Sequence, residues 1–275
     1  MEKKDPVEEA ELVKKVDEAL EKNLKETLFL LLQIAEIRVP GAMGRATLAK
    51  DAAEYVAQKL DLKEDEVKRI RRAATLHEIG KVGLPDDVIV KKYEDLSPYD
   101  RSLFQKYPVV GSMLVSTLSG LKESARDMHH QLENFDGSGL PDHLMEEEIP
   151  IGARILRAIN FCEALSGQGK TVEDSVQEIH RSAKKELDPR VAFLLAEFLT
   201  ENNKQFCNDT LKLQVNELMP GMKIAQDIYT YSGTKLLPKE VRLQEQMLRI
   251  LIERNEYDPI PGGVYVYNSM DTPIE

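Results

Sequence analysis

The spacing of apolar residues is helical over most of the first 205 positions, because apolar side chains recur every three or four residues. From about 7 to 37 they form one continuous stripe, which Pro40 and Gly41 interrupt. This predicts a long amphipathic helix whose exposed first half is suited to pairing with a partner. Further helices are predicted at about 45–60, 64–79, 98–106, 109–119, 121–133, 151–165, 171–185 and 189–205.

The pattern changes after Asn208, where β-branched and aromatic residues alternate with polar ones between Pro-Gly and Ser-Gly turns. We predict a small α+β domain here, with one helix near 243–255. The expected fold class is therefore mainly α, a helical bundle followed by a small C-terminal α+β domain. The expected divisions are an N-terminal amphipathic helix at 1–40, the helical domain at 41–208 and the α+β domain at 209–275.

Composition and charge narrow the classes of function. The chain is 42% hydrophobic and 31% charged and has no Trp, which favours a mainly helical protein. Its net charge of -11 argues against binding to a nucleic acid polymer or an anionic membrane, because phosphate affinity is built from Lys and Arg. The two cysteines, Cys162 and Cys207, favour a reducing cytoplasm over a disulfide framework. The apolar run at 28–32 is too short to cross a bilayer, so no membrane insertion is expected.

The most informative stretch is LHEIGKVGLPD at 76–86. His77 continues the apolar face of the preceding helix, so its side chain should point inward. An inward His followed by the carboxylate of Glu78 can form part of an Fe, Mn or Zn site, and Lys81 could contact a phosphate. The alternative is a hydrogen-bonded core His beside a solvated Glu78. A zincin-type protease is excluded because Lys81 stands where that motif needs a second His.

A second stretch, MHHQLENFDGSGLP at 128–141, leads from a helix into a glycine-containing loop. On a helical wheel His129 lies at the edge of the apolar stripe and His130 almost opposite, so at most one should face the same cavity as His77. Such a loop allows close approach of backbone to a ligand, although most loops of this kind are ordinary turns. The candidate ligand loop comprises Asp136, Gly137, Gly139, Leu140 and Pro141.

Five motifs follow one another in the order and approximate spacing of a known family: HEIGKVGLPDDVIVKK, KYPVVGSMLV, ENFDGSGLP, EEIPIGARILRAINFCEAL and LDPRVAFLLAEFL. Over roughly residues 28–200 the chain resembles the bacterial HD-GYP domains, which hydrolyse cyclic di-GMP. The resemblance implies an HD-GYP-like helical bundle in which His and Asp side chains hold two or three Fe or Mn ions. A metal-bound hydroxide would then attack the dinucleotide phosphate.

Carried over to this sequence, the resemblance places His77 and Glu78 at the family's His-Asp and keeps Lys81 as a phosphate contact. Counted without a gap from the glycine loop, His129 and His130 lie two residues before the family's paired His, and only a local insertion before Asp136 would restore their register. The remaining family ligand positions carry Arg45, Tyr107, Gln131, Leu132 and Asn160, and the Tyr of the family's Gly-Tyr-Pro is Leu140.

The leading hypothesis is a degenerate HD-GYP-like signalling module that is not an active enzyme and binds a protein partner or cyclic di-GMP. No metal cofactor is then expected, with Fe or Mn the candidates if the residual site is filled. The rival is an active metal-dependent phosphodiesterase that uses His77, Glu78 and His129 or His130, with Lys81 on the phosphate. A third hypothesis is a structural dimerisation unit built on the N-terminal helix, which makes a homodimer one candidate assembly.

Overall fold

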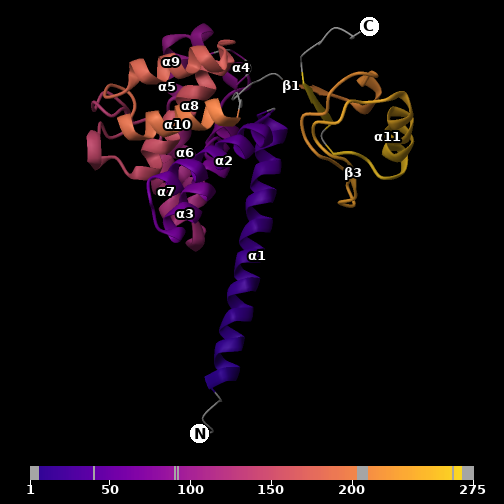
Figure 1. The fold of residues 1–275 in the computed structure, drawn as a ribbon, viewed down its shortest axis with the longest axis horizontal. Helices are drawn as coiled ribbons and strands as arrows, with labels where there is room; N and C mark the ends of the chain where they lie inside the picture. The colour runs from indigo at the N-terminus through magenta and orange to yellow at the C-terminus, as the bar shows by residue number, and fades with distance from the viewer. Residues whose placement is uncertain are drawn as a thin grey trace.

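The computed structural model describes residues 6–39, 41–89, 91, 93–202, 210–261 and 263–267. Figure 1 shows a helical bundle, a long N-terminal helix that extends beyond it, and a separate C-terminal lobe that contains the strands. The main helices are α1 (Pro6–Arg38), α2 (Ala42–Lys59), α3 (Glu64–Leu76), α5 (Pro98–Phe104), α6 (Tyr107–Ser116), α7 (Lys122–His129), α8 (Ile151–Gly167), α9 (Val172–Ser182) and α10 (Pro189–Asn202). Short helical turns are α4 (Asp86–Ile89), η1 (Ile79–Gly83), η2 (Tyr93–Asp95), η3 (Ser119–Leu121) and η4 (Glu146–Glu148).

The bundle core is built around α2 and α8. Small side chains such as Ala49, Ala52 and Ala53 line the buried face of α2, which lets α3, α8 and α10 approach it closely. The opposing faces carry larger side chains, among them Ile70 of α3, Ile159 of α8 and Leu195 of α10. One contiguous core therefore joins helices that are far apart in the sequence, and the prediction of a mainly α fold is confirmed.

α1 has two different faces. Leu24, Leu28 and Leu31 pack against the bundle core, and Ala35 is buried in it. A second set of apolar side chains on the same helix is exposed: Val16, Leu20, Phe29, Leu30, Ile34 and Ile37. The amphipathic pattern therefore marks a packing face only in part, because much of the apolar surface of α1 is not covered by the residues that the structure describes.

Several predicted helices end earlier than expected, and two of these ends lie beside candidate residues. The helix predicted at 121–133 is α7, which ends at His129, because Leu132 leaves the helix to form a bridge with Leu140 across the glycine loop. The helix predicted at 64–79 ends at Leu76 and continues as η1. There Gly80 lies against the backbone of Tyr107, so close that an added Cβ would stand 1.9 Å from the Tyr107 carbonyl oxygen. The last positions of the helix predicted at 189–205 lie outside the described residues.

The C-terminal lobe has its own small core. β1 (Thr210–Leu213) pairs antiparallel with β4 (Val264–Tyr267), and β2 (Ile228–Tyr229) pairs with β3 (Lys235–Leu237). α11 (Glu245–Tyr257) and the turn η5 (Val215–Glu217) complete the lobe. Its buried side chains, which include Ile224, Leu251 and Val266, form a cluster distinct from the bundle core. The predicted α+β character is thus confirmed, while the predicted boundary at 208 falls outside the described residues.

Among the residues that the structure describes, no helix has both the length and the apolar character needed to cross a membrane.

Candidate functional site

His77 lies at the centre of the bundle, where α3 gives way to η1, and only 1% of its surface is exposed. Its Nδ1–H donates to the carbonyl of Ala74 at 2.7 Å, and its Nε2 lies 3.2 Å from Oε2 of Glu163 on α8. Burial is the largest influence on the pKa of His77 and opposes protonation, but the carboxylates of Glu163 and Glu78 outweigh it and raise the pKa. The expected inward orientation of His77 is therefore confirmed.

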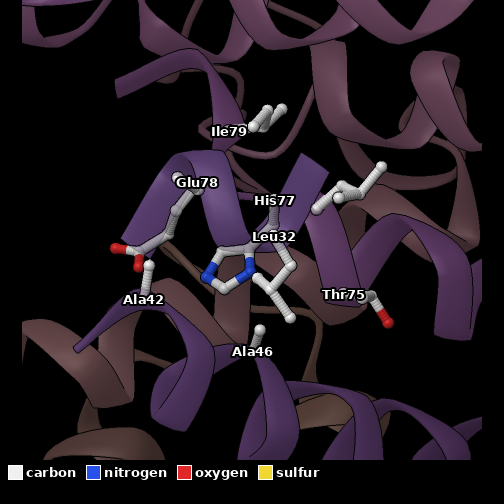
Figure 2. Close-up of a pocket in the computed structure, with 9 residues that line it drawn as sticks. Leu32, Ala42, Ala46, Thr75, His77, Glu78 and Ile79 are labelled. Atoms are coloured by element: carbon white, nitrogen blue, oxygen red, sulfur yellow. The ribbon is translucent and has the colours of Figure 1, made fainter. Parts of the chain in front are cut away.

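Beside His77 and Glu78 lies a small pocket, which Figure 2 shows between the start of η1 and the side chains of α1 and α2. Leu32 of α1 with Ala42 and Ala46 of α2 form its apolar wall. The pocket has room for about one water molecule. A dinucleotide therefore cannot enter at this point unless α1 or α2 moves.

Glu78 is buried, so the alternative of a solvated carboxylate is wrong. Its Oε2 accepts a hydrogen bond of 2.7 Å from Nε of Arg45 on α2, and its Oε1 accepts one from Nζ of Lys81. Burial alone would raise the pKa of Glu78, but the charges of Arg45, Lys81 and His77 hold it well below its ordinary value. Both carboxylate oxygens are thus paired with cationic side chains of this chain.

Lys81 is held on three sides. Besides its bond to Glu78, its ammonium group lies 5.0 Å from the ring centroid of Tyr107 and 5.4 Å from that of Phe104, within the range of a cation–π contact. The close approach of Gly80 to α6 brings Tyr107 next to it. Contact between Lys81 and a phosphate remains a prediction, and its ammonium group already donates one hydrogen bond to Glu78.

A second hydrogen-bonded chain connects three of the altered family positions. The hydroxyl of Tyr107 donates to Oδ1 of Asn160 at 3.3 Å, and Nδ2 of Asn160 donates to Oε1 of Gln131 at 3.1 Å. Nε2 of the Gln131 side chain then donates to the backbone carbonyl of His77 at 3.0 Å. Burial, followed by the charges of Glu78 and Glu163, raises the pKa of Tyr107 well above 10.0, so its oxygen is poorly suited to bind a metal.

The donor set can be tested against the bridged metal pair that the HD-GYP resemblance implies. Within the described residues, one potential ligand group is found here: His77, Glu78 and Glu163, whose ligand atoms lie within 4.8 Å of one another. Arg45 has no lone pair to offer, Leu132 has no donor atom, and the amide of Asn160 is already hydrogen-bonded. Three donors, one of them paired with two cations, do not fit a bridged pair of metal ions.

His129 and His130 do not join His77. They form a separate group with Asp142, in which Oδ2 of Asp142 lies 3.5 Å from Nε2 of His129 and 3.0 Å from Nε2 of His130. The expectation that at most one of them faces the cavity of His77 is met, since neither does, but their placement on different sides of a helix is wrong because His130 lies beyond the end of α7. The two rings therefore meet, with centroids 4.8 Å apart, instead of pointing in different directions.

The candidate ligand loop is held together by hydrogen bonds among its own and neighbouring residues. Oδ1 of Asp136 accepts hydrogen bonds from the amide and hydroxyl of Ser138, and these bonds lower the pKa of Asp136. Gly137 adopts a positive φ of 80°, and Gly139 packs so closely that a Cβ would stand 2.0 Å from the amide nitrogen of Asn134. Leu140, followed by Pro141, bonds through its amide to the carbonyl of Leu132. Both glycines are thus required by the turn, and binding of a ligand by this loop remains a prediction.

Two carboxylates of these clusters were not predicted. Glu163 lies one turn after Asn160 on α8, a spacing that puts both side chains on the same helix face and could have identified it. Asp142 has no such signal, because it follows Pro141 in an irregular segment. Its position is set by a bond from its own amide to Oε1 of buried Glu133 at 2.6 Å.

Known proteins share this architecture. Residues 30–191, more than half of the chain, match the HD domain family. The cyclic di-GMP phosphodiesterase response regulator RpfG of Xanthomonas campestris is 30% identical over 178 residues, which cover 62% of this chain and 47% of RpfG. A cyclic di-GMP phosphodiesterase of Thermotoga maritima is 31% identical over 153 residues, covering 52% of this chain and 41% of the relative.

The chain therefore spans less than half the length of these relatives. In fold it is similar to Bd1817, an HD-GYP-type protein of Bdellovibrio bacteriovorus, with a TM-score of 0.51 and 18% identity over 58% of this chain and 52% of that one. The region that matches the HD domain family, residues 30–191, covers α2 to α9 and includes the His77 and Glu78 pair. This chain belongs to the HD domain family and is an HD-GYP-like protein.

Proposed function

We propose that this chain is a cyclic di-GMP signalling module of the HD-GYP type that does not hydrolyse the dinucleotide and acts by binding. The observation that carries the proposal is the buried ion pair between Arg45 and Glu78, with Lys81 on the second carboxylate oxygen. In an HD-GYP centre the position of Glu78 would bind a metal ion. Here two side-chain cations already neutralise it, and we expect neither Fe nor Mn to be retained.

Electrostatics support this proposal. Two unit charges 4 Å apart interact by about 4 kcal/mol at an effective dielectric constant of 20. A divalent ion bound to Glu78 would be repelled by Arg45 and Lys81 with energies of this size or larger, unless both side chains moved away. Such movement would leave two cations without the partner that now compensates their burial.

An active phosphodiesterase is the second candidate. The three-residue group of His77, Glu78 and Glu163 favours it, because a single metal ion needs only about three protein ligands. This alternative requires Arg45 to release Glu78 and Lys81 to turn toward a phosphate. It predicts turnover that depends on His77.

The exposed apolar face of α1 supports association with a protein partner, and in the first place with a second copy of this chain. Val16 and Leu20, then Leu30, Ile34 and Ile37, follow the alternating spacing of four and three residues that defines a coiled-coil seam. Asn23 and Thr27 continue the same register between them. We therefore propose that α1 forms a homodimer seam, and that the cytoplasmic module signals as a dimer.

Hydrolysis and binding are measured on the same sample. Cyclic di-GMP is incubated with the full chain and Fe or Mn under reducing conditions, and its binding is followed by calorimetry. We expect saturable binding without turnover, and a loss of affinity of about tenfold in Lys81→Met. The matched control is Lys59→Met, which removes a lysine paired with Glu197 at the surface between α2 and α10. Turnover that disappears in His77→Ala would overturn the proposal.

The seam is tested separately by sedimentation. Leu30→Gln should convert a dimer to monomer, whereas Lys25→Gln, an exposed position of α1 outside the seam, should leave the dimer intact. A dimer without any dinucleotide binding would favour the purely structural dimerisation unit. A monomeric wild-type chain at high concentration would contradict the seam.

A further inference from the structure

The group formed by His129, His130 and Asp142 is independent of the centre around His77, and nothing in the proposed function uses it. Its three ligand atoms, two imidazole nitrogens and one carboxylate oxygen, lie within 4.8 Å of one another. We propose that these three side chains bind one divalent transition-metal ion of the zinc class at the surface where α7 meets the loop after Pro141.

The hydrogen bonds around His130 fix which nitrogen faces the carboxylate. Nδ1 of His130 lies 3.0 Å from the carbonyl oxygen of Arg126, which can only accept, so Nδ1 carries the proton. In the neutral ring the lone pair is then on Nε2, which points at Asp142. Metal-binding histidines are commonly oriented by a bond of this kind from the other ring nitrogen to a backbone carbonyl.

The same reasoning applies to His129. The hydroxyl of Ser112 donates its proton to the carbonyl of Val109 at 2.8 Å, so its oxygen accepts from Nδ1–H of His129 at 3.2 Å. The lone pair of His129 is therefore also on Nε2. Both Nε2 atoms therefore face the carboxylate of Asp142, and a cation at the centre of the three side chains would take the place of any proton shared between them.

The distances suit a tetrahedral ion. Zinc binds imidazole nitrogen and carboxylate oxygen at about 2.0–2.2 Å, so two ligand atoms of a tetrahedral site are about 3.3 Å apart. Oδ2 of Asp142 lies 3.0 Å from Nε2 of His130 and 3.5 Å from Nε2 of His129, and these two distances bracket the expected value. The donor set of two imidazoles and one carboxylate is also one that zinc accepts, with water completing the fourth position.

The site is both preorganised and open. Buried Glu133 holds the backbone of Asp142, and Ser112 of α6 holds His129, so two of the three ligands are positioned from the protein interior. The side chains themselves keep 29%, 14% and 52% exposure for His129, His130 and Asp142, which leaves a path for the ion. A bound ion would tie the end of α7 to the segment that follows the glycine loop.

The experiment is a titration of the metal-free full chain with zinc chloride, followed by calorimetry and by competition with a chromogenic chelator. We expect one equivalent of zinc to bind, with affinity reduced at least tenfold in His130→Asn and in Asp142→Asn. The matched control is His143→Asn, because His143 is adjacent and exposed but belongs to no ligand group, and Asn tolerates its positive φ of 57°. Zinc at about a hundred times its dissociation constant should raise the melting temperature by about 5 °C.

Two results would overturn the site. One is the absence of zinc binding to the wild-type chain, which needs no variant to fold. The other is binding that survives in folded His130→Asn and Asp142→Asn but is lost in Glu163→Gln, because the ion would then lie beside His77. The first result leaves the proposed function untouched, whereas the second would also contradict the expectation that the centre around His77 retains no metal ion, so the two failures can be told apart.

Discussion

The pair between Arg45 and Glu78 makes the sharpest prediction about stability. Only 14% of the Arg45 side chain and 5% of the Glu78 side chain are exposed, so both charges are taken largely out of water. Removing one partner of a buried pair costs about 3–5 kcal/mol, because the other charge stays buried. Lys81 remains on Glu78 in Arg45→Met, so we expect the lower end of this range, about 3 kcal/mol of unfolding free energy.

The assay is a double-mutant cycle of Arg45→Met, Glu78→Gln and the double variant, measured by urea unfolding at pH 7. A loss of about 3 kcal/mol corresponds to a fall in melting temperature of roughly 6–12 °C for a domain of this size. Glu78→Gln should cost less, since Arg45 still feels the charges of Glu163 and Glu36. The double variant should be more stable than the sum of the singles by about 1–3 kcal/mol.

The pH dependence follows from the depressed pKa of Glu78. A carboxyl whose pKa is lower in the folded state stabilises the fold at pH values above its ordinary pKa of 4.5. This stabilisation is lost progressively as the pH falls below 4.5. The difference between the wild type and Glu78→Gln should therefore shrink on acidification from pH 7 to 4. Additive single effects, or an Arg45→Met variant as stable as the wild type, would refute the pairing as the source of this stability.

Three further predictions concern packing and buried ionisable groups. Gly80→Ala should destabilise the chain by about 3 kcal/mol or more, because its Cβ would stand 1.9 Å from the Tyr107 carbonyl oxygen, whereas Gly83→Ala meets only an ordinary contact of 3.5 Å; thermal melting compares them. Burial raises the pKa of Asp127 from 3.8 to about 7, so stability should fall by about 4 kcal/mol as the pH rises between these values, and Asp127→Asn should abolish this fall in urea unfolding. Burial also raises the pKa of the Cys162 thiol, so this thiol should not react with iodoacetamide in the native chain. Mass spectrometry of the Cys207→Ser variant would show whether Cys162 stays unmodified.

Local patterns predicted most of the fold. Helical spacing and the positions of Gly and Pro identified the helices of the bundle, and the apolar stripe of α3 correctly placed His77 inside. The end of α7 could not be found in this way, because the bridge between Leu132 and Leu140 forms across a loop. Tertiary contacts of that kind leave no periodic signal in the sequence.

The site was predicted less completely, since side chains from different helices meet in it. His77 and Glu78 were identified as candidates, but the partners that define their chemistry, Glu163 and Arg45, lie 86 and 33 residues away from them. Arg45 was considered only as the loss of a ligand. Its second property, a positive charge aimed at Glu78, depends on the packing of α2 against α3 and becomes visible only in three dimensions.

A carboxylate at the position of Glu78 must be neutralised, since an unpaired charge in the interior costs several kcal/mol. A metal ion is one solution and a pair of side-chain cations is another, and the two oppose each other because Arg45 and Lys81 would repel a divalent ion beside Glu78. The presence of Arg45 is therefore more informative about cyclic di-GMP hydrolysis than the absence of the histidines that the HD-GYP resemblance implies. A lost ligand only weakens a metal site, whereas under the proposed function the guanidinium of Arg45 would take the metal's electrostatic role on the remaining carboxylate.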